Sequence, residues 1–501
     1  MLSKALSAYV VGIDASLVEV EVDISSRGLP HFSLVGLPDA AVKESKDRIR
    51  AALKQITVNL APADLKKEGS SFDLPIAIAI VAAEGVIPAA ALGDFIISGE
   101  LSLDGSVKPV RGALSIALEA KRLGLKGVIL PKENVAEAAV VSGIEVYAVG
   151  STPEVIELLT GASPGHAYSV DLDAVMAASS VYEDDFSDVK GQEHAKRALE
   201  VAAAGSHNVL MIGPPGSGKT MLARRLPTVL PPMTFEEALE TTKIHSVAGL
   251  LPGGQPLLAT RPYRSPHHTI SDVALIGGGQ VPRPGEVSLA HHGILFLDEL
   301  PEFKRNVLEV LRQPLESGAV TVSRAVATVS YPAQFVLVSA MNPCPCGFLG
   351  DSRHQCTCTP GMINRYRSRV SGPLLDRIDI HIDVPAVPYK ELSGGYSGEK
   401  SEAIRGRVID ARQRQLARFR GERIFANGQM KTRQLRKYCL LSEDAHTLLD
   451  TAMHKLGLSA RAHSRILKVS RTIADLDRSE QIQAGHVAEA VQYRTLDRGQ
   501  F

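Results

Sequence analysis

The sequence has no excess of either charge. Its 55 lysines and arginines are balanced by 55 aspartates and glutamates. A strongly basic chain would indicate a polyanionic partner, and the chain as a whole gives no such indication. Any surface for nucleic acid must therefore be local. The one strongly basic stretch, Lys400 to Lys437, holds twelve lysines or arginines against three acids. It predicts either a DNA-binding helix or a solvated helix face.

Long apolar runs and a secretory leader are also lacking. Residues 1–5 show no basic flank followed by an apolar run, which a signal peptide would need. The most apolar segment, residues 75–92, is interrupted by Glu84 and Pro88, and neither side is long enough to span a bilayer. We therefore expect a cytoplasmic protein without a membrane partner.

Cysteine is scarce and unevenly distributed. Four of the five cysteines form two close pairs, Cys344 with Cys346 and Cys356 with Cys358. Four thiolates around one loop suit tetrahedral zinc, so the spacing predicts a structural zinc site rather than a secreted disulfide framework. The alternatives are unligated thiols or a reversible disulfide, and His354 is an alternative ligand.

A chain of 501 residues is too long for a single core, and its patterns divide it. The alternating run Val18–Val22 and the helical spacing of residues 42–53 and 112–123 predict an N-terminal α/β domain. The predicted fold class is α/β, divided into a domain at 1–165, a linker at 166–185, a nucleotide-binding core at 186–390 with the cysteine cluster at 344–358, and a helical domain at 391–501 that follows a glycine-rich junction at 394–398.

One octapeptide has the spacing of a phosphate-binding P-loop. Glycines let a loop fold around an anion with successive N–H groups pointing at the phosphates. The apolar run Val209–Ile212 before it predicts a buried parallel strand, and the residues after it predict a helix. ATP is therefore the expected ligand, bound by Gly213, Pro214, Pro215, Gly216, Ser217, Gly218, Lys219 and Thr220.

Further polar residues follow apolar strands. Asp298 and Glu299 come directly after an apolar run, at the strand end where doubly wound sheets bind ligands. We expect Thr220 and Asp298 to hold Mg²⁺, and Glu299 to activate the attacking water. Asn342 follows the run 335–341 and is a further candidate for contact with that water, or else a simple turn residue before Pro343.

Two arginines are candidates for charge stabilisation at the γ-phosphate. Arg377 lies between apolar flanks in Leu374–Asp379. In ring ATPases an arginine there points at the neighbour's γ-phosphate, and a surface ion pair with Asp376 or Asp379 is the alternative. Arg461 or Arg465, at the start of a helix in the last domain, is the second candidate, and Arg461 is preferred.

These motifs resemble those of one family. The segments 186–192, 213–220, 285–299 and 342–347 look like the magnesium-chelatase-like AAA+ proteins, and the whole chain is most similar to their ComM/YifB competence-protein branch. The resemblance implies a Lon-protease-like N-terminal domain, an AAA+ core with inserted hairpins and a helical lid. It also implies a homo-oligomeric ring, usually a hexamer, that uses ATP for helicase or branch-migration work on DNA in recombination.

The long interval between Thr220 and Asp298 contains loop chemistry that includes Arg261 and Arg264. The run 319–329 predicts a hairpin with Arg324 at its tip. These three arginines are candidates for DNA contact, and a solvent-exposed turn residue is the alternative for Arg324.

The N-terminal domain also resembles the Lon protease domain, which needs a serine nucleophile and a lysine base. Ser71 falls at the serine position, but Leu114 stands where the lysine is expected. Substitution by Lys67 or Lys108 is the alternative. Three functions therefore compete: a DNA motor, which we prefer, a magnesium-chelatase-type motor that remodels a protein partner, and an ATP-dependent protease.

Overall fold

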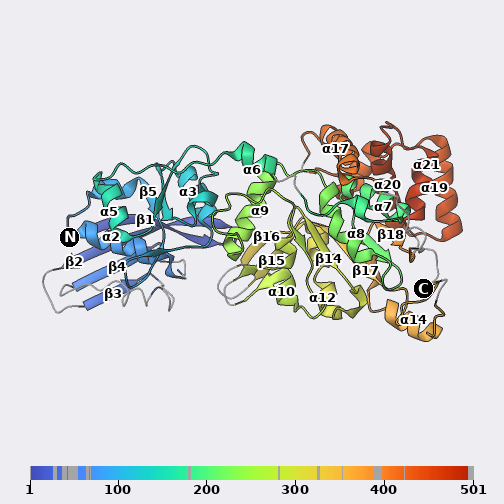
Figure 1. The fold of residues 1–501 in the computed structure, drawn as a ribbon, viewed down its shortest axis with the longest axis horizontal. Coiled ribbons are helices and arrows are strands. Elements are labelled where there is room, and N and C mark those ends of the chain that lie inside the picture. Colours follow the sequence, from blue (N-terminus) through green and yellow to red (C-terminus); the bar gives the residue numbers. More distant parts are fainter. Residues whose placement is uncertain are drawn as a thin grey trace.

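A computed structural model shows an elongated molecule in which an N-terminal α/β region, a central sheet and a C-terminal group of helices follow one another (Figure 1). The described residues are 2–25, 31–36, 42, 55–63, 67, 69–178, 182–279, 282–323, 328–351, 354–387, 398–422 and 424–494.

The N-terminal region is built on a seven-stranded mixed sheet with the order β3-β4-β2-β1-β5-β8-β9. The strands are β1 (Leu2–Val11), β2 (Asp14–Ser25), β3 (His31–Val35), β4 (Gln55–Ala61), β5 (Phe95–Ile97), β8 (Gly127–Pro131) and β9 (Glu145–Val149). Strands β1 and β2 form an antiparallel hairpin, whereas β5, β8 and β9 are parallel. Val18, Val20 and Val22 are buried while the glutamates between them are not, as the alternation predicted.

Helices pack on this sheet and join it to the central region. The main ones are α2 (Asp73–Ala83), α3 (Ala113–Arg122), α4 (Val135–Ala138) and α5 (Thr152–Thr160), and a short hairpin consists of β6 (Glu100–Leu101) and β7 (Val107–Lys108). Helix α9 (Phe235–Ala248) of the central region shares a core with α3, through residues such as Met233 and Ala238. An ion pair of 2.5 Å between Lys243 and Asp14 joins the same two regions.

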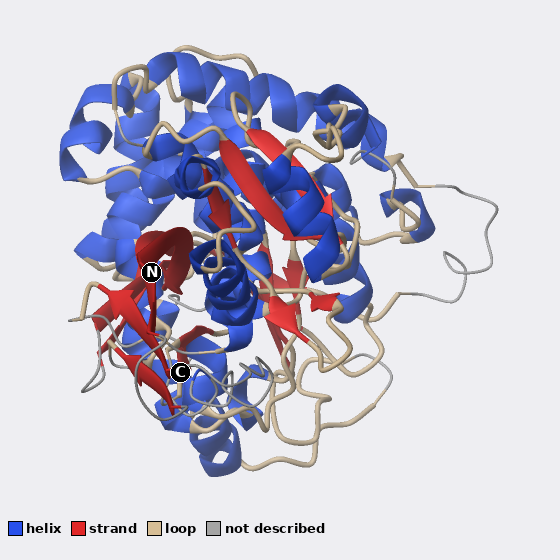
Figure 2. Ribbon diagram, turned by 90° about the vertical axis from the view of Figure 1, so that its left-hand side faces the viewer, coloured by secondary structure: helices blue, strands red, loops and turns tan. Residues whose placement is uncertain are grey.

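The central region contains a five-stranded sheet with the order β11-β14-β17-β10-β18, and all of its pairings are parallel. The strands are β11 (Tyr263–Arg264), β14 (Ile294–Leu297), β17 (Val336–Met341), β10 (Val209–Ile212) and β18 (Ile380–Asp383). All residues of β10, β14 and β17 are buried, because helices cover both faces of the sheet. The end-on view in Figure 2 shows strands enclosed by helices.

The helices around this sheet are α7 (Glu193–Gly205), α8 (Lys219–Arg225), α10 (Asp272–Ile276), α11 (Glu286–Leu289), α12 (Arg305–Glu309), α13 (Arg312–Ser317), α14 (Pro360–Arg367) and α15 (Gly372–Leu375). Two small hairpins are inserted, β12 (Gly277–Gly278) with β13 (Arg283–Pro284), and β15 (Ala319–Ser323) with β16 (Thr328–Pro332). Tyr331 joins them by donating its hydroxyl to the carbonyl of Pro282 over 2.7 Å. The antiparallel pairing of β15 with β16 confirms the hairpin predicted within 319–329.

The C-terminal region is helical. It contains α17 (Ser401–Arg418), α18 (Thr432–Tyr438), α19 (Glu443–Leu456), α20 (Ala460–Leu476) and α21 (Ala484–Gln492). Helix α20 starts at the N-cap Ser459, whose hydroxyl accepts the Ala462 N–H, and buries Ile466, Val469 and Ile473 against the central core.

The mixed α/β class, with a parallel sheet and a helical C-terminal region, is confirmed. The segment predicted as a linker contains one helix, α6 (Leu172–Ala178). Most of the helix predicted at 42–53, and the glycine-rich junction up to residue 397, lie outside the described residues. Among the helices that the structure describes, none combines the length and the apolar character needed to cross a membrane.

Candidate active site

The predicted phosphate-binding loop connects β10 to α8 at the carboxyl edge of the sheet. Gly216 and Gly218 have φ values of +73° and +93°, a conformation that glycine adopts without strain. A Cβ on Gly213 would lie 2.0 Å from the carbonyl oxygen of Val384, so the loop also requires glycine at its start. The strand and helix predicted on either side of the loop are confirmed.

Lys219 occupies the first position of α8 and bends back over the loop. Its Nζ donates to the carbonyls of Gly213 and Pro214 at 2.7 and 2.9 Å, and lies 3.4 Å from Oδ1 of Asn342. Burial lowers the pKa of Lys219, while the nearby Asp298 and Glu299 favour its charged form. The ammonium group is thus held by weak neutral acceptors at a place where a phosphate would be a stronger partner.

Three adjacent strands bring the remaining predicted residues to this edge. Asp298 follows β14 and Asn342 follows β17, which lies between β14 and β10. The Thr220 hydroxyl donates to Oδ2 of Asp298 over 2.7 Å. A hydroxyl and a carboxylate at the end of a P-loop are the oxygen ligands that Mg²⁺ takes beside phosphates, so these two residues fit the predicted ion.

Glu299 has an unusual backbone. Its φ of +52° is left-handed, which costs a residue other than glycine about 1–2 kcal/mol. Its N–H donates to Oδ1 of Asp298 at 2.9 Å, and its side chain is 58% exposed. Nδ1 of His268 lies 3.6 Å from Oε2 of Glu299.

Sequence reasoning missed the role of His268 as a neighbour of this carboxylate. The strand before it, β11, has only two residues and no apolar run. A histidine shortly after a parallel strand would have been the signal, but no periodicity marks so short a strand.

Arg377 lies at the opposite edge of the sheet from the P-loop. The parallel register pairs Val209 with Ile380, so Arg377 precedes the start of β18 whereas the P-loop follows the end of β10. The four-residue strands alone separate the two edges by about 13 Å. The Arg377 side chain donates to the carbonyl of Pro373 and pairs with Glu316. It therefore cannot contact a phosphate bound by its own chain.

Arg461 lies beside Arg377 rather than beside the P-loop. Its Nη1 is 2.6 Å from Oδ2 of Asp376, and its side chain is 72% exposed. The alternative candidate, Arg465, is one helical turn later and pairs with Oδ1 of Asp379 at 2.9 Å. Arg461 is the more exposed of these two candidates, and its partner Asp376 directly precedes Arg377, so both Arg377 and Arg461 lie at this edge of the sheet.

A buried polar network holds the C-terminal helices on this edge. Asp379 is 2% exposed, and its Oδ2 lies 2.9 Å from Nδ1 of His207. Nε2 of His207 is 2.8 Å from the Thr472 hydroxyl on α20. Burial lowers the pKa of His207, so the neutral ring donates to Asp379 and accepts from Thr472. This network was not predicted.

Of the three arginines considered for DNA contact, two have their guanidinium groups occupied within the chain. Arg261 donates to the carbonyls of Pro231 and His292 at 2.6 and 2.7 Å and pairs with Glu237 at 2.9 Å. Arg264 forms a bidentate pair with Glu286 at 2.6 and 2.8 Å. Arg324 lies outside the described residues.

The predicted basic helix also has arginines that are paired within the chain. In α17, Arg407 pairs with Glu200 and Glu399, and Arg412 donates to the carbonyls of Ala203 and Ala204. Arg407 and Arg412 therefore anchor α17 on the core, a role that neither alternative for this segment, DNA contact or a solvated face, included.

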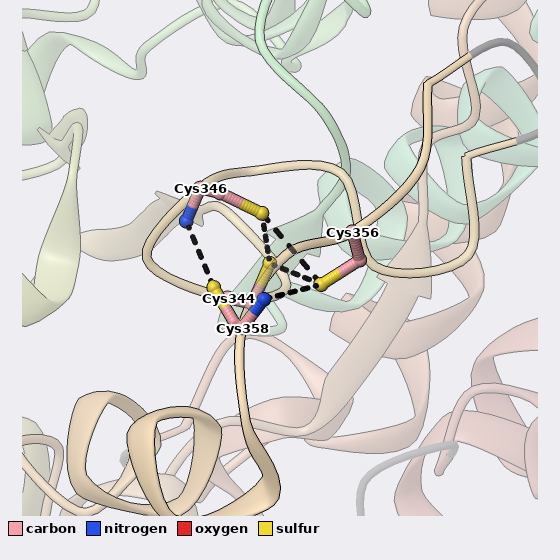
Figure 3. A group of neighbouring side chains, drawn as sticks. All are labelled: Cys344, Cys346, Cys356 and Cys358. Atoms are coloured by element: carbon pink, nitrogen blue, oxygen red, sulfur yellow. Dashed lines mark hydrogen bonds between the residues drawn. The ribbon is translucent and has the colours of Figure 1, made fainter.

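The four clustered cysteines face one another directly after Asn342 (Figure 3). Sulfur–sulfur distances are 3.4 Å for Cys344–Cys346, 3.7 Å for Cys344–Cys356 and 3.6 Å for Cys346–Cys356, and all four sulfurs lie within 4.8 Å of one another. Tetrahedral zinc with bonds of about 2.3 Å needs sulfurs about 3.8 Å apart. The four residues therefore fit zinc, whereas His354, which is 61% exposed and stacks on Phe348, is not among them.

We expect one zinc ion per chain at this site, and we expect its loss to loosen the loop between Cys344 and Cys358. Replacing Cys356 with serine removes a ligand and should lower the metal content to near zero and the thermal midpoint by several degrees. Elemental analysis and thermal unfolding measure both. The buried Cys439, changed to serine, is the matched control and should retain the metal. Equal metal content in both variants would refute the site.

A second group of metal-ligand type, Glu240 with His291 and His292, is better described as a hydrogen-bond network. Nδ1 of His291 accepts the Gln334 N–H at 3.0 Å, so the proton of the neutral ring is on Nε2. That nitrogen faces Oε2 of Glu240 at 3.2 Å and would have to be deprotonated to bind a metal.

The residues considered for Lon-type proteolysis differ in how deeply they are buried. Leu114 is the second residue of α3 and is fully buried, and Lys108 is exposed on the β6–β7 hairpin. Lys67 is fully buried and donates to the carbonyl of Pro62. Leu114 has no basic group, so the expected lysine position stays without a base.

Comparison with known proteins agrees with these features. Residues 185–392 match the family model "Magnesium chelatase, subunit ChlI", residues 20–134 match "Subunit ChlI of Mg-chelatase", and residues 398–494 match "Magnesium chelatase, subunit ChlI C-terminal". Each of the three models matches part of a different region of the chain.

Several relatives are similar over nearly the full length. Protein YifB of Salmonella typhimurium is 46% identical over 97% of this chain and 96% of its own. The competence protein ComM of Haemophilus influenzae is 45% identical, with the same coverage. The magnesium-chelatase 38 kDa subunit of Rhodobacter capsulatus is 29% identical over 32% of this chain and 50% of its own.

Proposed function

Because this chain belongs to the magnesium-chelatase-like AAA+ family, in the group that contains YifB and ComM, we propose that it is a ring-forming ATPase that moves DNA strands. Family membership implies ATP and Mg²⁺ as its ligands. The proposal includes a non-proteolytic Lon-like domain at residues 1–165, an AAA+ core at 186–390 and a helical lid at 391–501. Its setting would be recombination or natural transformation, by analogy with the competence protein.

The residues at the P-loop edge have distinct tasks in this proposal. Lys219 exchanges its carbonyl partners for the β- and γ-phosphates, while Thr220 and Asp298 hold Mg²⁺, which neutralises charge on the phosphate oxygens. Glu299, which directly follows Asp298 and whose side chain is 58% exposed, accepts the proton of the attacking water. Asn342, 3.4 Å from Lys219, orients that water from the neighbouring strand.

The observation that carries the ring is the position of the two arginines. Arg377 and Arg461 lie at the edge opposite to the P-loop of the same chain, where their own phosphates are out of reach. Both reach a γ-phosphate only if a second copy presents its P-loop to this edge. Such a head-to-tail contact repeats around a closed ring, and we propose a hexamer.

DNA contact is assigned to the inserted hairpins. The pairs β12–β13 and β15–β16 are held together by the Tyr331–Pro282 hydrogen bond. In the sequence, Arg324 falls between β15 and β16. In this proposal the hairpins project into the ring. The zinc-bound loop, directly after Asn342, would brace the end of β17 behind them.

The test is ATP-dependent branch migration on a labelled three-strand junction, with Lys219→Ala as the inactive control. The wild-type protein should resolve the junction, and the variant should lose turnover by at least about 100-fold because its γ-phosphate contact is gone. If the wild-type protein hydrolyses ATP but moves no strand and is not stimulated by any DNA, the DNA-motor proposal is refuted.

The second candidate is a chelatase-type motor that remodels a protein partner, which the family models and the Rhodobacter relative favour. It predicts ATP hydrolysis that ignores DNA and responds to a partner protein. Proteolysis is a weaker candidate because of Leu114, and casein cleavage would test it.

A further inference from the structure

A cleft lined by three arginines lies near the P-loop edge, between segments that include parts of α12 and α14. Figure 1 shows these two helices on the lower side of the view. The cleft has a volume of about 590 Å³ and is lined by Pro301, Glu302, Phe303, Arg305, Arg365, Ser368 and Arg369. One wall comes from the segment directly after Glu299 and the other from α14 and the turn behind it. We call it the arginine cleft.

The charges of the cleft are poorly balanced. Glu302 is its one acid, and it pairs with Nη1 of Arg369 at 2.9 Å. Arg305 and Arg365 are exposed, and among the described residues their guanidinium groups have no salt bridge or hydrogen bond. This contrasts with Arg261, Arg264 and Arg407, whose donors are occupied within the chain. Unpaired guanidinium groups in a concave site favour an anionic ligand with several acceptor oxygens.

We propose that the arginine cleft binds the phosphodiester backbone of single-stranded DNA. The cleft is larger than a single phosphate needs, and its cations come from two walls, which fits an extended polyanion. Phe303 is 4% exposed and offers no face for a base to stack on. Contact is therefore with phosphates and not with bases, which makes it independent of sequence. This inference rests on the DNA-motor proposal and adds a contact outside the inserted hairpins.

The walls of the cleft are connected to the ATPase residues. Glu302 donates its N–H to the carbonyl of Glu299 over 2.8 Å. On α14, the buried Tyr366 forms a hydrogen bond with the backbone of Asn342, and Nε of Arg367 donates to the carbonyl of Pro343 over 3.1 Å. A bound DNA strand that draws the two walls together would therefore act on both Glu299 and Asn342. For this reason, DNA in the cleft should stimulate ATP hydrolysis.

The test compares the full-length wild-type protein with the double variant Arg305→Gln/Arg365→Gln. Among the described residues, neither guanidinium group has a hydrogen bond or salt bridge, so their loss removes charge without breaking such a contact. The probe is a fluorescent oligothymidylate, and the readout is the slope of log Kd against log salt concentration. Two lost phosphate contacts should weaken binding at least about tenfold and reduce the slope by about 1.4.

The control variant, Lys121→Gln/Lys455→Gln, removes two exposed charges elsewhere and should bind like the wild type. A salt slope equal to that of the wild type in the double variant would overturn the cleft assignment. If the double variant keeps the wild-type slope but forms smaller rings, the cleft instead binds acidic residues of a neighbouring subunit. Should the double variant not fold, Arg365→Gln alone is measured, with an expected slope change of about 0.7.

The outcomes separate this inference from the proposed function. If the wild-type protein binds no oligonucleotide, the DNA-motor proposal itself fails. If the wild-type protein binds DNA and the double variant binds equally well, only the arginine cleft is refuted.

Discussion

Two variants that are each inactive are expected to recover ATPase activity when they are assembled into the same ring. Arg377→Ala removes the arginine that reaches the neighbour's γ-phosphate, a loss of about 10³-fold or more. Lys219→Ala removes the lysine of the chain's own P-loop. The two residues lie at opposite edges of the sheet. In the proposed ring, each active site therefore takes Lys219 from one subunit and Arg377 from the next.

In rings formed by co-expression of equal amounts, about a quarter of the interfaces combine an intact P-loop with an intact neighbouring arginine. Steady-state ATPase should therefore rise to a comparable fraction of the wild-type rate. The matched control is co-expression of Lys219→Ala with the double variant Lys219→Ala/Arg377→Ala, in which no interface is intact. Failure of the first mixture to exceed the control would show that Arg377 does not act between subunits.

The largest effect on stability is expected for Asp379→Ala. Asp379 is almost fully buried and pairs with Arg465 on α20 and with His207 before β10. Its removal leaves the partly buried Arg465 and the buried, neutral His207 without their partner, which costs about 3 kcal/mol, the lower end for breaking a buried pair. Thermal unfolding should report this loss, and α20 should detach first, because Asp379 joins that helix to the sheet.

Asp376→Ala is the matched control, since Asp376 pairs with Arg461 at the surface, where such a contact contributes less than about 1 kcal/mol. The effect of pH gives a second check. Burial by itself would raise the pKa of Asp379. The charge of Arg465 and the hydrogen bond with His207 outweigh burial and hold this pKa well below its ordinary value of 3.8. The stabilisation is therefore present above pH 3.8 and is lost only as the pH falls below that value. Equal unfolding midpoints for both variants at neutral pH would contradict the prediction.

Much of the nucleotide site was predictable because its residues are tied to short-range patterns. A glycine-rich octapeptide between an apolar strand and a helix constrains its own backbone, and Asp298 and Asn342 each follow an apolar run directly. Parallel strands end at the same edge of a sheet, so the proximity of Asp298 and Asn342 followed from the α/β class. The cysteine pairs were predictable for the same reason, because the loop that joins them is short.

The arginines were harder to assign. Arg261, Arg264 and Arg377 are all arginines in loops or at element ends, and nothing local tells which has a free guanidinium group. That depends on acids distant in the sequence, such as Glu237, Glu286 and Glu316. The same holds for the arginine cleft, whose walls are separated by the whole of β15–β17.

The sequence by itself determined that this chain has a P-loop with its magnesium-binding acid, a tight cluster of four thiols and an α/β core followed by helices. Each of these depends on residues close together in the chain, where backbone conformation and spacing dictate the chemistry. Only the tertiary structure decided that Arg377 and Arg461 lie opposite to the P-loop, that His207 and Asp379 join the lid to the sheet, and that Arg305 and Arg365 face one cleft. These relations are set by strand order and helix packing, which bring distant segments together and leave no trace in local patterns.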